Sequence, residues 1–108
     1  MFHPRITRYR NRLLEAAEPA CFATLADWIY NEDISIPPAF THIETVSEHH
    51  LKVAYFRMKV ADGNRGVFVI RGTDNFENIK DDARFLLNNW EIRPEIIAFL
   101  FDIFRDLQ

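Results

Sequence analysis

A run of four large apolar residues, Val67 to Ile70, constrains the fold of this chain more than any other feature of its sequence. A strand that is apolar at every position is buried on both faces, so the run predicts an interior strand of a covered sheet. The turn signal Asp62-Gly63-Asn64 precedes it, and the alternating segment Leu51 to Val60 precedes the turn. The sequence therefore predicts an antiparallel hairpin whose second strand is central.

Helical segments flank these strands on both sides. Thr7 to Ala17 favours helix, and Pro19 interrupts it and opens a second helix that runs roughly to Tyr30. After the central strand, Asp74 is expected to cap a helix, with Glu77 completing a capping box. A last helix opens at Pro94, and its expected apolar face holds Ile96, Ile97, Leu100, Phe101, Phe104 and Leu107.

Together these elements predict an α/β fold, or α+β if the region forms an isolated piece. N-terminal helices would precede a β-hairpin or small sheet, to which Thr41 to Ser47 adds a weakly alternating strand, and two C-terminal helices would follow. A length of 108 residues fits a single domain, so we expect residues 1–108 to form one.

The charge and composition of the chain narrow the classes of molecule that it could bind and the compartment in which it could work. The net charge is −3 and the pI is about 5.8, so the chain lacks the overall basic field that gathers nucleic acid. No stretch approaches the roughly 18 apolar residues of a membrane span, and the N-terminus does not resemble a signal peptide. The single cysteine, Cys21, fits a reducing compartment, and we expect a cytoplasmic protein. A local anion patch and a solvated helix face both explain the arginines Arg5, Arg8, Arg10 and Arg12.

The sequence offers no recognisable nucleophile, metal site or cofactor site. Neither Ser35 nor Ser47 stands in a G-x-S-x-G motif, which exposes a serine on a strained turn. Cys21 lies in an apolar helical stripe, which is typical of an inert core thiol. Adjacent His49 and His50 would point to opposite sides of a strand, so we expect no metal site.

One feature has the geometry of a reactive site, namely the strand end Arg71-Gly72-Thr73-Asp74, which leads directly into a helix. Such an end directs backbone N–H groups and a hydroxyl beyond the sheet, where α/β enzymes hold substrates and where an oxyanion needs donors. A tight turn, with Gly72 for backbone freedom and Asp74 as a cap, explains the same residues. Both interpretations stay open on physical grounds.

The segment Val67 to Asp74, followed by Asn78 and Asp82, resembles the class 3 lipases. That family has a hydrophobic strand, then R-G-S or R-G-T, then a helix with the pattern N-W-x-x-D. Here Asn78 and Asp82 match the polar positions, and Ile79 stands where tryptophan is usual. The resemblance covers about residues 20 to 90.

The resemblance implies that Thr73 belongs to the oxyanion hole of an α/β-hydrolase. It also implies that Gly72 allows close backbone approach, and that Asp74 and Asp82 support the turn and the helix after it. In full-length relatives the nucleophile follows the region that matches this chain. We therefore expect a hydrolase front part that is inactive alone, with an ester or lipid substrate only in a full-length parent.

Two alternatives differ from this expectation. The first is a non-catalytic binding or regulatory module that self-associates as a homo-oligomer. Its contacts would be an open edge of the strand Val67 to Ile70 or the last helix. The second is an independent enzyme using Thr73, Asp82 and a histidine, which is disfavoured because an unactivated threonine hydroxyl is a poor nucleophile.

Overall fold

The structure, a computed structural model, describes residues 5–8, 19–72, 75–89 and 91–106. In these residues, four strands form one antiparallel sheet in the order β1-β4-β3-β2. The strands are β1 (Arg5–Arg8), β2 (Phe40–Glu48), β3 (Leu51–Val60) and β4 (Gly63–Arg71), and the helices are α1 (Pro19–Trp28), α2 (Phe76–Leu87) and α3 (Pro94–Asp106). The fold is therefore of the α+β class, and its sheet is antiparallel throughout.

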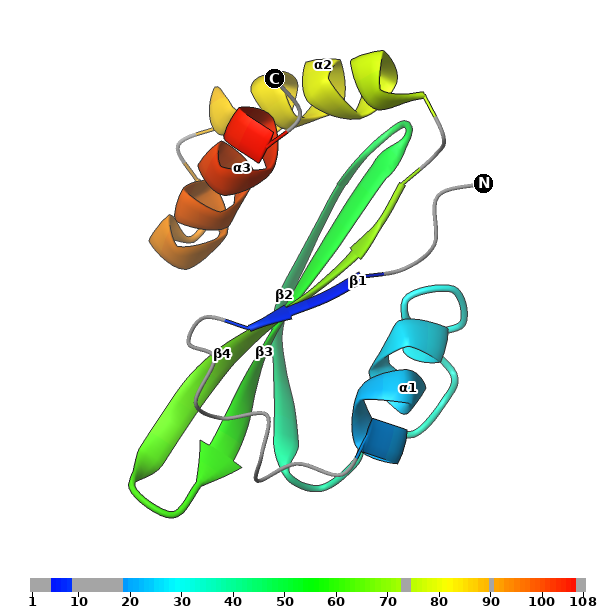
Figure 1. Cartoon of the computed structure of the whole chain (residues 1–108), viewed down its shortest axis with the longest axis vertical. Coiled ribbons are helices and arrows are strands. Elements are labelled where there is room, and N and C mark those ends of the chain that lie inside the picture. Colours follow the sequence, from blue (N-terminus) through cyan, green and yellow to red (C-terminus); the bar gives the residue numbers. More distant parts are fainter. Residues whose placement is uncertain (1–4, 9–18, 73–74, 90, 107–108) are drawn as a thin grey trace.

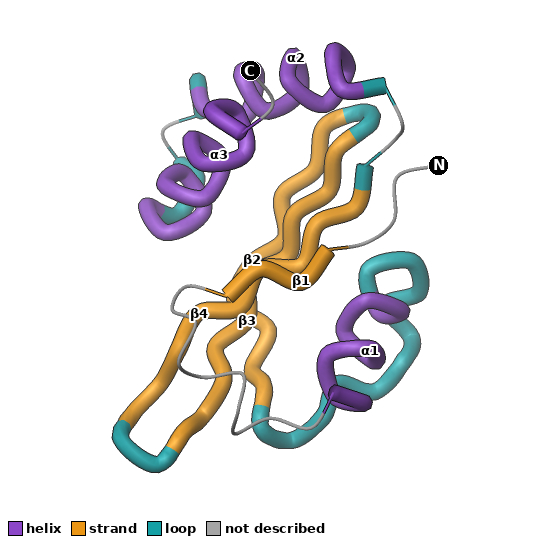
Figure 2. The backbone as a smooth tube through the Cα atoms, viewed as in Figure 1, coloured by secondary structure: helices purple, strands orange, loops and turns teal. Residues whose placement is uncertain are grey.

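The sheet separates two hydrophobic cores. Helix α1 covers one face, and α2 and α3 cover the other, as Figures 1 and 2 show. On the α1 face, Leu25, Trp28 and Ile29 pack against Phe56 of β3 and Val67 of β4, among others. The core on the opposite face combines strand residues with residues of α2, α3 and the segment between them: Leu51, Val53, Tyr55, Phe68, Ile70, Ile79, Ala83, Leu86, Ile92, Ile96, Phe99 and Leu100.

Strand β4 is interior, as its apolar run predicts. Its four apolar residues, Val67 to Ile70, are at most 4% exposed, because alternate side chains enter alternate cores. The expectation that this strand has an open edge is wrong, since β1 pairs with it from Val67 to Ile70. The edges of the described sheet are β1 and β2.

The helix expected from Thr7 to Ala17 is wrong at its start. Thr7 and Arg8 belong to β1, and residues 9–17 lie outside the described part of the chain. The β-branched residues Ile6 and Thr7 favour extended backbone, and β4 offers a row of backbone groups to pair with. Tertiary pairing thus overrides local helix propensity at this position.

The last helix begins at Pro94 as expected, but its buried face is rotated from the predicted one. Phe101 is 59% exposed, whereas Phe99 is 6% exposed and stacks on Phe68 with ring centroids 4.3 Å apart. The sequence of α3 is apolar over much of its circumference, so periodicity alone does not fix which side faces the sheet. Leu107 lies outside the described residues. No helix within the described residues is long and apolar enough to cross a membrane.

Candidate functional site

The predicted site residues gather around the junction between β4 and α2. Thr73 and Asp74 lie outside the described residues, so their roles stay predictions. A Cβ atom at Gly72 would lie 2.8 Å from Cδ1 of Ile79 and 3.5 Å from the carbonyl oxygen of His50. The group nearest to this glycine is therefore the side chain of Ile79 in α2, which is fully buried. Gly72 allows the helix to close on the end of the strand.

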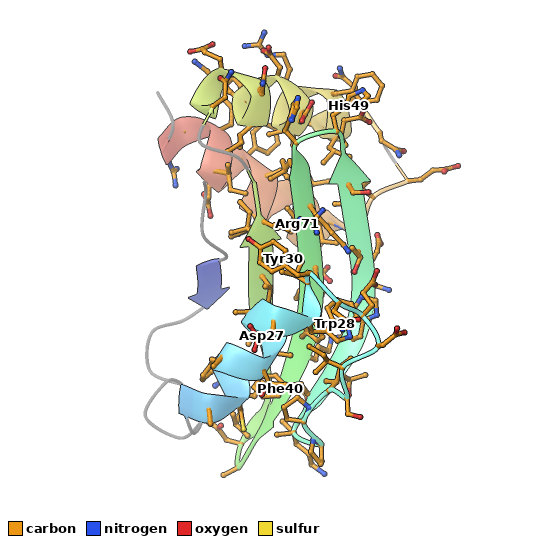
Figure 3. The ribbon with its side chains drawn as sticks, turned by 90° about the vertical axis from the view of Figure 1, so that its right-hand side faces the viewer. Asp27, Trp28, Tyr30, Phe40, His49 and Arg71 are labelled. Carbon is orange, nitrogen blue, oxygen red and sulfur yellow. The ribbon has the colours of Figure 1, made fainter. Side chains whose placement is uncertain are left out.

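Asp82 ties α2 to the turn between β2 and β3. The residue is 7% exposed, and its Oδ2 accepts a hydrogen bond of 2.6 Å from the backbone N–H of His50. The turn consists of His49 and His50, and His49 has a φ of 34°; Figure 3 shows His49 beside α2. Asp82 therefore binds backbone rather than an imidazole, which does not fit the arrangement that an Asp–His catalytic pair requires.

Helix α2 is capped one residue later than the sequence suggested. Asn75 is the N-cap, and its Oδ1 accepts from the backbone N–H groups of Glu77 at 3.1 Å and Asn78 at 3.3 Å. The expected cap at Asp74 is therefore wrong. Two adjacent residues were competent to cap, and the choice between them is consistent with the helix phase that buries Ile79 against Gly72. The side chain of Asn78 is half-buried.

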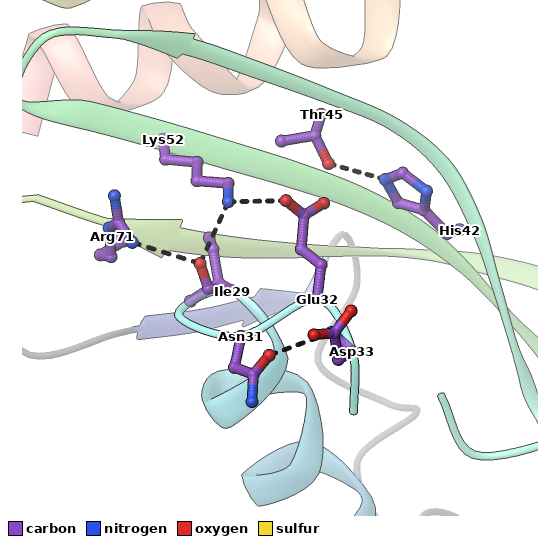
Figure 4. Close-up of polar contacts among 8 residues, drawn as sticks. All are labelled: Ile29, Asn31, Glu32, Asp33, His42, Thr45, Lys52 and Arg71. Carbon is purple, nitrogen blue, oxygen red and sulfur yellow. Dashed lines mark hydrogen bonds and ion pairs between the residues drawn. The ribbon is translucent and has the colours of Figure 1, made fainter. Parts of the chain in front are cut away.

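A second group of polar residues, which the sequence did not reveal, lies on the α1 face of the sheet. Lys52 of β3 and Arg71 of β4 are directly paired in register, and both donate to the carbonyl oxygen of Ile29 (Figure 4). The distances are 3.2 Å from Lys52 Nζ and 3.4 Å from Arg71 Nη1. Ile29 directly follows α1, and cations are favourable at the C-terminal end of a helix. We call Lys52 and Arg71 the basic pair.

Two further contacts define the surroundings of the basic pair. Lys52 Nζ also contacts Glu32 Oε2 at 3.2 Å, with side chains 16% and 53% exposed. The guanidinium of Arg71 lies 5.2 Å from the ring centroid of Tyr30, and Figure 3 shows the two residues next to each other. Within the described residues, no carboxylate lies within ion-pair distance of Arg71. The group thus holds two cations and one carboxylate.

The hairpin that brings the basic pair together was predicted from the sequence, but its register was not. The turn consists of Ala61 and Asp62, one residue before the expected Asp62-Gly63-Asn64 signal, and Val60 lies opposite Gly63. Counting outward from that pair along both strands brings Lys52 opposite Arg71. The contact with Ile29 was not accessible in this way, because it depends on where α1 packs.

A β-bulge in β2 creates another polar contact. The register shifts between His42 and Glu44, so residues 42 and 45 lie on the same side of the strand instead of on opposite sides. His42 Nε2 and Thr45 Oγ1 are 2.7 Å apart (Figure 4). The ring centroids of His42 and Trp28 lie 4.9 Å apart. Among the described residues no carboxylate forms an ion pair with His42, so the third member of a nucleophile–base–acid arrangement is missing there.

Among the described residues, no three side chains of His, Cys, Asp or Glu are grouped to hold a metal ion. Cys21 is a free, half-buried thiol at the edge of the α1 core. Comparison of the chain with protein-family models, with curated proteins and with solved structures gave no match.

We predict that Gly72→Ala destabilises the fold by about 1–3 kcal/mol, because the new methyl group overlaps Ile79 in a filled core. Adding Ile79→Val removes Cδ1, so the double variant should lose less stability than the two single losses together. Urea unfolding of all three variants measures the coupling. As a control, Gly63→Ala is strained by its φ of 134°, so Ile79→Val should not rescue it. Additive losses for Gly72→Ala and Ile79→Val would show that no such contact exists.

We predict that Asp82→Ala lowers the free energy of unfolding by about 1–2 kcal/mol, because the His50 N–H loses a charged acceptor. Amide hydrogen exchange at His50 should accelerate in the same variant. The neighbouring Asp81 is exposed, so Asp81→Ala provides a control with the same change of charge. Equal exchange rates at His50 in both variants would contradict the assigned bond.

Proposed function

We propose that this chain is the front part of an ester hydrolase of the class 3 lipase type. It would carry the oxyanion segment and lack the nucleophile, and so be inactive alone. The observation that supports the proposal is that the described residues on both sides of Thr73-Asp74 are packed against or cap α2. Gly72 is closed by buried Ile79 on one side, and Asn75 caps α2 on the other. Oxyanion donors act by being held in place before the reaction, so anchoring of the flanking residues favours this role for Thr73.

In this proposal, Thr73 supplies its backbone N–H and its hydroxyl to the oxyanion of a tetrahedral intermediate. The other residues of the motif act indirectly. Asp82 holds α2 against the β2–β3 turn, and Gly72 lets Ile79 lock the strand end. The nucleophile, its base and its acid would come from another segment. Proposed substrates are esters, including lipid esters.

The proposal predicts no hydrolysis of p-nitrophenyl esters above the buffer rate by the 108-residue chain. It also predicts that the native reading frame continues after Gln108 into a G-x-S-x-G motif. In that longer protein, Thr73→Ala should lower kcat by roughly 10²–10³-fold, the usual effect of losing an oxyanion donor, whereas Thr73→Ser should retain most activity. Thr41→Ala, at an exposed position in β2, is the matched control. A stop codon directly after Gln108 would refute the proposal.

A second candidate function is a non-catalytic module that self-associates. The pairing of β1 with β4 favours it, because this pairing completes the sheet around its apolar strand without any further strand. The other edge strand, β2, is nine residues long and contains no Lys, Arg or Pro, which are the residues that commonly protect sheet edges. A second copy of the chain is the proposed partner, bound through β2 or α3. The proposed location is the cytoplasm, supported by the single free thiol of Cys21.

If β2 pairs with β2 of a second copy, Ser47→Glu should favour the monomer. The new carboxylate joins Glu44 and Glu48 on the same strand and repels its symmetry mate, yet inside the monomer it faces Lys52. Ser35→Glu adds the same charge to an exposed loop and should leave the association unchanged. Light scattering over a wide range of concentrations measures the mass. For the α3 route, Phe101→Ser removes an exposed aromatic ring instead. A wild-type chain that stays monomeric throughout would exclude both routes.

A further inference from the structure

We propose that the basic pair, Lys52 and Arg71, binds a compact oxyanion such as a phosphate or carboxylate group. The site lies on the α1 face of the sheet, beside the C-terminal end of α1. It goes beyond ester hydrolysis and does not depend on it, because binding requires only residues that the structure describes.

The first argument is the electrostatic cost of the pair. Like charges directly opposite each other on neighbouring antiparallel strands are destabilising. The Lys52 side chain is only 16% exposed, so water screens this repulsion less than it would at an open surface. One carboxylate, Glu32, offsets part of it, and the Ile29 carbonyl contributes only a partial charge. One positive charge therefore remains in excess, and an anion would neutralise it.

The second argument is the set of donors that remain available. A guanidinium carries five N–H donors in a planar fork that fits oxyanions. Arg71 uses one of them within the described residues, in a long bond of 3.4 Å to Ile29. Its guanidinium also lies 5.2 Å from the ring centroid of Tyr30, and Tyr30 is 48% exposed, so this side of the basic pair borders solvent. The basic pair is thus incompletely satisfied.

Capping of α1 by itself does not explain the arrangement. One cation suffices to bind the carbonyl of Ile29, and Lys52 already does so at the shorter distance. Arg71 adds a longer bond to the same oxygen together with a like-charge neighbour. A second cation also gains from the end of the helix, but the repulsion from its like-charge neighbour reduces that gain. An oxyanion that bridges both cations gives the pair a favourable role.

Glu32 acts as a built-in competitor for the site. Its half-exposed carboxylate contacts Lys52 at 3.2 Å from a loop after α1, where a ligand oxyanion would bind. Removing its charge should therefore strengthen anion binding, whereas removing the charge of Arg71 should weaken it. Net charge alone predicts the same two signs, so matched charge changes elsewhere on the sheet are needed to separate a built site from general attraction to a charged surface.

The experiment is a titration of the 108-residue chain with sodium phosphate and, separately, sodium acetate at constant ionic strength. Nitrogen-15 NMR follows the side-chain signal of Arg71 and the backbone amides of residues 29–32. We expect saturable shifts, about tenfold weaker affinity for Arg71→Gln, and about threefold tighter affinity for Glu32→Gln. Arg57→Gln and Glu44→Gln make the same charge changes elsewhere on β3 and β2 and should leave the affinity unchanged. Sedimentation with phosphatidic acid or phosphatidylcholine vesicles then tells whether a lipid headgroup is the source of the anion.

Two results would overturn the proposal. One is the absence of saturable shifts at Arg71 with either anion. The other is an equal gain in affinity from Glu32→Gln and Glu44→Gln, which would mean that net charge alone governs binding. The test survives a destabilised Arg71→Gln variant, because Glu32→Gln changes an exposed loop and predicts a gain. Neither result depends on whether the chain belongs to an ester hydrolase.

Discussion

The burial of β4 on both faces is the constraint on which the rest of this structure depends. Val67 to Ile70 place two side chains in each core, so each face of the sheet must be covered. Helix α1 covers one face, and the pair α2 and α3 covers the other. Both candidate sites follow from this arrangement, because each lies where a covering helix meets the ends of the central strands.

The two faces of the same strand end therefore carry different chemistry. Toward α2, Gly72 offers no side chain, and the buried Ile79 fills the space. Toward α1, Arg71 extends from the neighbouring position to the carbonyl of Ile29. Successive residues of a strand point to opposite faces, so Gly72 leaves space for α2 on one face while Arg71 binds the end of α1 on the other. A single strand terminus thus joins the two layers, and a change there affects both.

Local patterns were enough to predict the hairpin, the interior strand and the start of α3. Each of these depends on contacts between residues near in sequence or on the strict alternation of a strand. The strand β1 was missed because its conformation depends on partners 59 to 65 positions away in the sequence. The buried face of α3 was misjudged because its apolar residues surround most of the helix, and stacking of Phe99 on Phe68 selects the phase. At the site, Asp82 was identified by resemblance, whereas its partner, the N–H of His50, depends on how α2 crosses a distant turn.

The pairing of β1 also bears on how a hydrolase could be built on this sheet. A nucleophile strand placed beside β4 would have to use the backbone groups that β1 uses between Val67 and Ile70. Replacing one neighbouring strand by another leaves the number of backbone hydrogen bonds nearly unchanged, so backbone hydrogen bonding favours neither β1 nor a nucleophile strand. The side chains differ instead, because β1 spans only four residues with an arginine at each end. In the proposed hydrolase, the strand beside β4 would have to bury more apolar surface against this edge than β1 does. The two proposals therefore differ in which strand occupies this side of β4.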